Sequence, residues 1–399
     1  MMVLVRALAV AALAAVTGVV DASPQAPSAP APWTAAPSAG AAPGAAGAAS
    51  GAASGSASGT CNNSPTLCSR QYNQITHMGA HDSSFLRDKS TGNSPAGNQF
   101  LNATIALDAG FRLLQTQVHK VDSGVRMCHT SCGILDAGPL DSWLANVADW
   151  VRRNPNDVIT IILANPRSVS ARDLGVAFER SGITRFAYKP ASAAATANWP
   201  TLQTMIGQGS RVVIFTTNTE ASPEIPYMLP HFLHIFETPF EVTQLTGFNC
   251  SLDRPKAAGQ PVQAIAKGYM GMANHFKYRP IDSSFLKTVA KSVGIGSDIL
   301  VPDAERINTV NSPDMSADGN LGKHVEQCRS EWGQRPNFVL VDFWDRQAPL
   351  EVADRLNGVS GATGRKVVVM TAAASRERGG HVLGVVVACL TAAAMWLPL

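Results

Sequence analysis

The chain has 399 residues, of which 32 are Lys or Arg and 29 are Asp or Glu, so its formal net charge at pH 7 is only +3. This near-neutral balance gives no case for nucleic acid as a partner, because proteins that bind nucleic acid concentrate positive charge. The length leaves room for one large domain or two modest ones between the terminal segments.

The amino-terminal end has the pattern of a secretory signal peptide. Arg6 is followed by an uninterrupted apolar stretch, and Val20-Asp21-Ala22 offers a cleavage point after Ala22. We expect residues 1–22 to be removed on export, with a retained membrane anchor as the alternative. Residues 23–60 are almost entirely Ala, Pro, Ser and Gly, which lack the large side chains that offset ordering entropy, so we expect a disordered stalk.

The carboxyl-terminal residues 371–399 have the order of a glycosylphosphatidylinositol (GPI) attachment signal. Small residues at 372–374 precede a short polar spacer at 375–381, and an uncharged apolar run then closes the chain. The alternative is a helix retained in the membrane, because the apolar run is just long enough to span a bilayer. Export to the cell surface on a lipid anchor is the expectation.

Residues 61–370 are expected to form a single folded domain, since no second low-complexity segment divides them. The chain has seven Cys, and removal of Cys389 with the tail would leave six, an even number that indicates three disulfides in an exported protein. We favour the pairs Cys61 with Cys68, Cys128 with Cys132, and Cys250 with Cys328. A zinc site around Cys128-His129-Thr130-Ser131-Cys132 is the alternative.

Apolar runs of strand length alternate with helical patterns through this domain, which predicts a parallel sheet. The best helix is expected between Leu140 and Arg153, where Leu140, Trp143, Leu144 and Val147 recur on one face. The eight runs are 74–81, 111–119, 125–130, 158–165, 211–218, 232–238, 268–275 and 337–344. We predict an α/β fold, an irregular TIM-type (β/α)8 barrel, with a doubly wound sheet as the alternative.

Polar residues end these runs, where a parallel barrel carries its reactive side chains. They are His81, Asp82, Gln115, Gln117, His129, Asn165, Asn218, Glu237, Asn274, His275 and Asp342. Alternation along a strand places Gln115 and Gln117 on one face, so we expect both to point toward the same site. His81 and His129 are candidates for acid-base chemistry because imidazole titrates near neutral pH.

The blocks THMGAHDSSF, GFRLLQTQVH, MCHTSCGILDAGPLDSWL, NPNDVITIILAN, FETPFEV and NFVLVDFWD occur in this order. With them the chain resembles the PLC-like phosphodiesterase superfamily, typified by the X domain of phosphatidylinositol-specific phospholipase C, and most of all its secreted fungal branch. The resemblance covers residues 61 to about 359. It implies a TIM-type barrel that cleaves a phosphodiester, without an essential bound metal in the bacterial members.

The resemblance also implies roles for individual residues. His81 would be the general base, oriented by Asp342, and His129 the general acid, with Asp82 as its carboxylate partner. Substrate contacts are expected from Gln115, Gln117, Asn165, Glu237, Asn274 and His275. No cofactor is implied, although a divalent metal remains an open alternative.

The chain departs from the family pattern on the second strand. Gln115-Thr116-Gln117 stands where most members have Asp-x-Arg, and a neutral amide brings no positive charge to the phosphate. Two functions therefore remain open. One is an extracellular phosphoric diester hydrolase acting on inositol phospholipids, GPI glycans or glycerophosphodiesters. The other is a catalytically weakened barrel that serves as a cell-surface binding or structural protein.

Processing of both ends can be tested directly. The mature protein is expected to begin near Ser23 and to end near Ala374 on a lipid anchor, because both apolar ends look like processing signals. Intact-mass measurement of the membrane-bound protein checks this. Recovery of Trp396 in that protein would contradict the anchor. N-glycans are expected at the sequons of Asn62, Asn102 and Asn249.

Overall fold

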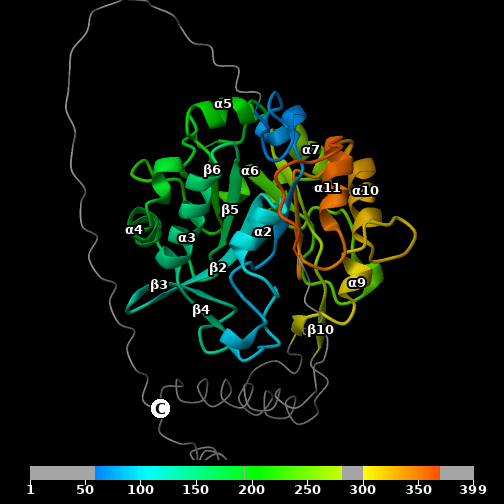
Figure 1. Cartoon of the computed structure of the whole chain (residues 1–399), viewed down its shortest axis with the longest axis horizontal. Coiled ribbons are helices and arrows are strands. Elements are labelled where there is room, and N and C mark those ends of the chain that lie inside the picture. Colours follow the sequence, from blue (N-terminus) through cyan, green and yellow to red (C-terminus); the bar gives the residue numbers. More distant parts are fainter. Residues whose placement is uncertain (1–58, 193, 281–299, 369–399) are drawn as a thin grey trace, which may run out of the picture. The chain divides into compact units, whose positions relative to one another are not determined.

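The computed structural model describes residues 59–192, 194–280 and 300–368 (Figure 1). The signal peptide, nearly all of the stalk and the anchor signal expected from the sequence therefore lie outside the described residues. Within them, the main sheet has ten strands, and eight follow one path in the order β7-β6-β5-β2-β1-β12-β9-β8. Every neighbouring pair along this path is parallel, so all eight carboxyl ends lie at the same edge.

The fold is an α/β barrel of the TIM type, curled but not closed, because β7 and β8 end the path without pairing to each other. The path strands are β1 (His77–Ala80), β2 (Leu113–Val121), β5 (Ile159–Ala164), β6 (Val212–Thr216), β7 (Met228–Pro230), β8 (Ile235–Glu237), β9 (Met270–Asn274) and β12 (Phe338–Val341). The other strands are β3 (Gly124–Cys128), β4 (Asp136–Pro139), β10 (Tyr278–Pro280) and β11 (Leu300–Pro302). A barrel was predicted, and the alternative of a doubly wound sheet is wrong.

One of the eight predicted strands is not part of the parallel path. The run 125–130 forms β3, which pairs antiparallel with β2 and then with β4. Only two residues separate β2 from β3, too few for the crossover that a parallel neighbour requires, so a hairpin forms instead. Its place is taken by β7, a three-residue strand beside β6 that the sequence pattern did not reveal.

Helices lie around the outside of the barrel (Figure 1). Their apolar faces pack on the sheet in two outer clusters, one from α3 and α4 against β2, β5 and β6, the other from α10 and α11 against β1, β9 and β12. They are α2 (Ala103–Ala109), α3 (Leu140–Arg153), α4 (Ala171–Ser181), α5 (Leu202–Gly207), α6 (His231–His234), α7 (Pro261–Ala266), α9 (Ile307–Val310), α10 (Leu321–Trp332) and α11 (Pro349–Asn357). The predicted helix at 140–153 is confirmed as α3.

A third cluster fills the barrel interior with Leu113, Ile162, Phe215, Phe338 and Leu340. These side chains are at most 2% exposed, so they form a packed floor beneath the carboxyl-terminal edge of the sheet. In the part of the chain that the structure describes, no helix combines the length and apolarity that crossing a bilayer requires.

All three expected disulfides are confirmed: Cys61–Cys68, Cys128–Cys132 and Cys250–Cys328. The zinc alternative at residues 128–132 is wrong because both thiols are consumed. One expected glycan site is also wrong. The amide of Asn62 is buried, donating to Val158 O at 3.0 Å and accepting from Val158 N at 2.7 Å, so it is inaccessible in the folded chain. Asn102 and Asn249 lie at the surface.

Candidate active site

The imidazole of His81 follows β1 and is fixed by a carboxylate from the neighbouring strand β12. Its Nδ1 lies 2.8 Å from Asp342 Oδ1, and the side chain of Asn98 donates to the same oxygen at 3.0 Å. Because a carboxylate only accepts, the proton of this ring lies on Nδ1 and Nε2 is left for a substrate. The pair is 261 residues apart in sequence, and the parallel pairing of β1 with β12 brings it together.

The face of the His81 ring is covered by Phe276, whose ring is stacked on it at 3.5 Å between centroids and 4° between planes. This stacking fixes the ring plane in addition to the hydrogen bond to Asp342. The sequence did not single out Phe276 or Asn98. Both lie in loops that follow no recognisable motif, so only the folded chain reveals them.

Asp82 lies between the two histidines. Its Oδ2 is 3.7 Å from His81 Nε2 and 3.6 Å from His129 Nε2, and its side chain is fully buried. Its backbone has a φ of 46°, in the left-handed region that a non-glycine residue seldom adopts. Strain of this kind occurs where the surrounding structure requires one particular side-chain direction.

His129 is carried by the short loop that the Cys128–Cys132 disulfide closes. Within that loop Thr130 also has a positive φ, 60°, and its hydroxyl lies 3.3 Å from His129 Nδ1. The ring of Phe85 contacts the histidine edge-on, at 5.2 Å between centroids. The disulfide and these contacts hold the second imidazole beside Asp82, although the hairpin that precedes it is outside the parallel barrel.

Gln115 and Gln117 both hold Asp82. The side-chain oxygen of Gln115 accepts from Asp82 N at 2.7 Å, while Gln117 Nε2 donates to Asp82 Oδ2 at 2.7 Å. The oxygen of Gln117 in turn accepts from Thr130 N at 3.0 Å. Gln117 therefore links the barrel strand, the central carboxylate and the disulfide loop, and we call this arrangement the amide clamp. The oxygen and one N–H of Gln117 are already engaged, so its amide has one N–H left and brings no positive charge to a phosphate.

Several buried polar atoms at the site have no hydrogen-bond partner among the described residues. They are Asp82 Oδ1, Asn98 Oδ1, His129 Nε2 and Asp342 Oδ2. Buried polar atoms are nearly always hydrogen-bonded, so a group of such atoms at one place indicates where a polar ligand could bind.

A cavity of about 260 Å³ opens beside His81 at the carboxyl-terminal edge of the sheet. Of the residues predicted from the sequence, His81, Gln115, Gln117, Asn165, Asn218, Glu237 and Asn274 line it, whereas Asp82, His129 and Asp342 do not. Further lining residues that the sequence did not single out include Arg254, Phe240, Phe276 and Tyr278.

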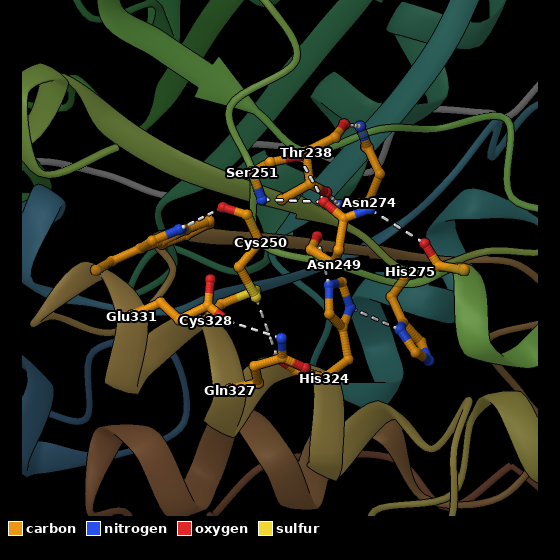
Figure 2. Close-up of a disulfide and its surroundings, with 12 residues drawn as sticks. Thr238, Asn249, Cys250, Ser251, Asn274, His275, His324, Gln327, Cys328 and Glu331 are labelled. Atoms are coloured by element: carbon orange, nitrogen blue, oxygen red, sulfur yellow. Dashed lines mark hydrogen bonds between the residues drawn. A yellow bond between two sulfur atoms is a disulfide. The ribbon is translucent and has the colours of Figure 1, made fainter. Parts of the chain in front are cut away.

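His275 is not part of this cavity. Its Nδ1 lies 2.9 Å from His324 Nδ1 and its Nε2 donates to Val310 O at 2.8 Å, so the ring is directed toward α10, as Figure 2 shows. The alternation of side chains along β9 explains this, because Asn274 points inward and the next residue must point outward. The same view contains the Cys250–Cys328 disulfide.

Two groups of side chains that could in principle hold a metal ion lie away from the cavity. Among the described residues, groups of three potential ligands are Cys250 with His324 and Cys328, and Cys128 with Cys132 and Asp136. In both groups the Cys pair is a disulfide, so neither offers a thiolate.

The pKa values of the two imidazoles are shifted in opposite directions. Burial disfavours the charged form of His81, but the nearby carboxylates of Asp82 and Asp342 outweigh this and raise its pKa. Burial lowers the pKa of His129, and the attraction of Asp82 does not compensate. A proton added to the neutral pair therefore favours His81 over His129.

The α/β barrel described above is a phosphodiesterase fold of the phospholipase C class. The chain belongs to the PI-PLC X domain family, whose model (PI-PLC X 1) matches residues 67–357.

Two proteins of the fungus Arthroderma benhamiae are similar over most of this region. One, named PI-PLC X domain-containing protein 1, is 34% identical over 301 residues, covering 75% of this chain and 90% of that protein. The other, named an uncharacterized secreted protein, is 35% identical over 305 residues, and the alignment covers 75% of this chain but only 64% of that relative's length. The three disulfides likewise suit an oxidising compartment.

Solved structures with a similar arrangement are bacterial phosphatidylinositol-specific phospholipases C. The Listeria monocytogenes enzyme shares 13% identity, with a TM-score of 0.43 over 73% of this chain and 95% of that one. A single-site mutant of the Staphylococcus aureus enzyme gives 13% identity and a TM-score of 0.43 over 74% of this chain and 96% of that one.

The amide clamp can be tested by Gln117→Glu, which keeps the acceptor for Thr130 N but puts a second carboxylate against Asp82. Two carboxylates this close raise the pKa of one of them, so the variant should be least destabilised near pH 4 and lose stability as the pH rises. At pH 7 we expect a loss of about 1–3 kcal/mol in urea unfolding.

The matched control is Gln327→Glu on α10, where Gln327 Nε2 donates to Glu331 Oε1 at 2.7 Å on an exposed surface. Water screens the new carboxylate pair there, so its unfolding free energy should change by less than about 0.5 kcal/mol. Equal losses in the two variants, or no dependence on pH for Gln117→Glu, would contradict the clamp.

The causes of the two pKa shifts predict the effect of Asp342→Asn. This substitution removes both a charge and a hydrogen bond from His81, so the pKa of His81 should fall by about one pH unit or more. The pKa of His129 should fall less, since Asp342 acts on it only through its charge. Titration of the histidine ring signals by NMR measures both, with His324 on α10, whose charge state does not depend on Asp342, as an internal reference. An unchanged His81 pKa would show that Asp342 does not set its charge state.

Proposed function

We propose that this protein is an extracellular phosphoric diester hydrolase that acts on the headgroup of an inositol phospholipid, a GPI glycan or a glycerophosphodiester. The observation that supports this is the pair of imidazoles beside Asp82, one of them fixed by Asp342 and lining the cavity. In-line phosphoryl transfer needs one group that accepts a proton and one that donates it. One neutral and one protonated imidazole at this site would meet that need.

In the proposed cycle His81 accepts the proton of the attacking hydroxyl at Nε2, because its Nδ1–H is already donated to Asp342. The attacking group is a neighbouring hydroxyl of the substrate or a water molecule. As the new phosphorus–oxygen bond forms, the bond to the leaving oxygen breaks, and His129 gives its proton to that oxygen. The Asp342 carboxylate stabilises the imidazolium that forms on His81.

These roles require the shared proton to start on His129, whereas the pKa directions favour His81. Because the two rings titrate as a coupled pair, the form with the proton on His129 is a minority of the singly protonated state. The reverse order, with His81 as acid and His129 as base, uses the majority form. Both orders need one neutral and one protonated ring, so either gives a bell-shaped dependence of kcat/KM on pH.

A binding or structural role at the cell surface is the second candidate. The observation that favours it is the amide clamp, which uses the position of the usual arginine for an internal contact. Without that guanidinium, charge developing on the phosphate is less well stabilised, and the barrel would retain a pocket with little turnover. Anchoring by GPI is part of our proposal for either function.

Turnover decides between them. The mature protein is incubated with phosphatidylinositol and with glycerophosphoinositol, with and without a chelator, beside His81→Ala, His129→Ala and the exposed control Lys120→Ala. Loss of either ring should lower turnover by about 10² to 10⁴, and loss of both should cost much less than the product of the single losses. Near-parental turnover in both single variants, or none in the parent, would favour the binding role.

A further inference from the structure

Positive charge for a phosphate ligand must come from somewhere other than the amide clamp. The carboxyl group of Glu237 lines the cavity, and Asp82, Asp342 and Glu237 all act on the charge of His81, which lines it too. A phosphate placed among these groups would be repelled unless a cation compensated.

Arg254 meets this need from the loop that pairs with the end of β8. Among the described residues that line the cavity it is the only Lys or Arg. Its guanidinium is ion-paired with Glu237 Oε1 at 2.8 Å and lies over the ring of Phe240 at 4.2 Å, so its direction is fixed from two sides. These contacts use only part of the donor set, since a guanidinium has five N–H groups.

The backbone holds Arg254 beside its partner as well. Glu237 N donates to Arg254 O at 2.8 Å across an isolated bridge that joins the end of β8 to this loop. Glu237 is itself held by Asn274, whose Nδ2 donates to Oε2 at 3.1 Å. The side chain of Arg254 remains 43% exposed, while its Nε is buried without a protein partner among the described residues. A guanidinium whose direction is fixed and whose side chain is partly exposed suits an oxyanion.

We propose that Arg254 binds a phosphate group of the ligand in this cavity and supplies the positive charge that β2 lacks in this chain. Glu237 and Phe240 act as positioning residues that hold the guanidinium. The proposal rests on the cavity being the ligand site of the proposed function. The phosphate is either the diester itself or a monoester on the same headgroup, and both present the same oxyanion chemistry.

The test measures binding, so it does not depend on turnover. Calorimetric titrations of the mature protein use inorganic phosphate, myo-inositol 1-phosphate, glycerophosphoinositol and uncharged myo-inositol. In Arg254→Gln the affinity for the phosphate probes should fall about tenfold or more, the weight of a charge-assisted hydrogen bond. The affinity for myo-inositol should change less than twofold.

Lys256→Gln is the matched control, because it removes the same charge two residues away on a side chain that is 76% exposed. It should leave all affinities within about twofold, since water screens its charge. Equal loss in the two variants would reduce the effect to nonspecific charge and overturn the proposal. So would parental phosphate affinity in Arg254→Gln, or no phosphate binding by the parent.

If Arg254→Gln does not fold, Glu237→Gln provides a test in the opposite direction. Gln keeps a side-chain oxygen that can accept from the guanidinium and so hold its direction, but it removes the negative charge, so phosphate should bind more tightly; unchanged or weaker binding would overturn the proposal. If the affinity for glycerophosphoinositol depends on Arg254, this residue binds the diester. If only the affinity for the monoester depends on it, Arg254 binds a terminal phosphate. Arg254-dependent binding without turnover would refute the hydrolase but not this site.

Discussion

The candidate site depends on the contacts of one buried carboxylate, that of Asp82. It lies within 3.7 Å of both imidazoles, and its own position is held by Gln117 through a 2.7 Å hydrogen bond. A carboxylate with no exposed surface is stable only if its charge is shared with such donors. The same residue also joins the barrel to the disulfide loop through Thr130, so Gln117 of β2 adds to the disulfide in holding the loop that carries His129.

The amide clamp explains what this chain gains from the departure at Gln117. An amide presents a donor at one end and an acceptor at the other, which is what a carboxylate on one side and a backbone N–H on the other require. A guanidinium has donors only and could not accept from Thr130 N. Compared with the Asp-x-Arg that the resemblance leads us to expect on this strand, Gln117 brings no charge and instead links two parts of the site.

Electrostatics around the cavity follow from the same departure. With β2 neutral, the carboxylates of Asp82, Asp342 and Glu237 raise the pKa of His81, and Arg254 is the only Lys or Arg among the described residues that line the cavity. Binding of a negatively charged ligand in the cavity would therefore favour the protonated form of His81. An oxyanion that approaches Arg254 also lies near a ring whose pKa is raised, which favours binding of a negatively charged group over a neutral one.

Sequence alone determined the parts of this protein that depend on local pattern: the helix at Leu140–Arg153, most strands of the barrel and the three disulfides. These follow because periodicity, cysteine count and short motifs are properties of neighbouring residues. Only the tertiary structure decided that the run at 125–130 is a hairpin strand, that Asn62 is buried, and that His275 faces α10. Likewise, Asn98, Phe276 and Arg254 reach the site from loops, and no pattern along the chain encodes which distant strand ends those loops will meet. The sequence also could not predict the hydrogen-bond partners of the Gln117 amide. Its nitrogen meets Asp82 and its oxygen meets Thr130 only because parallel pairing and the disulfide bring these residues beside it.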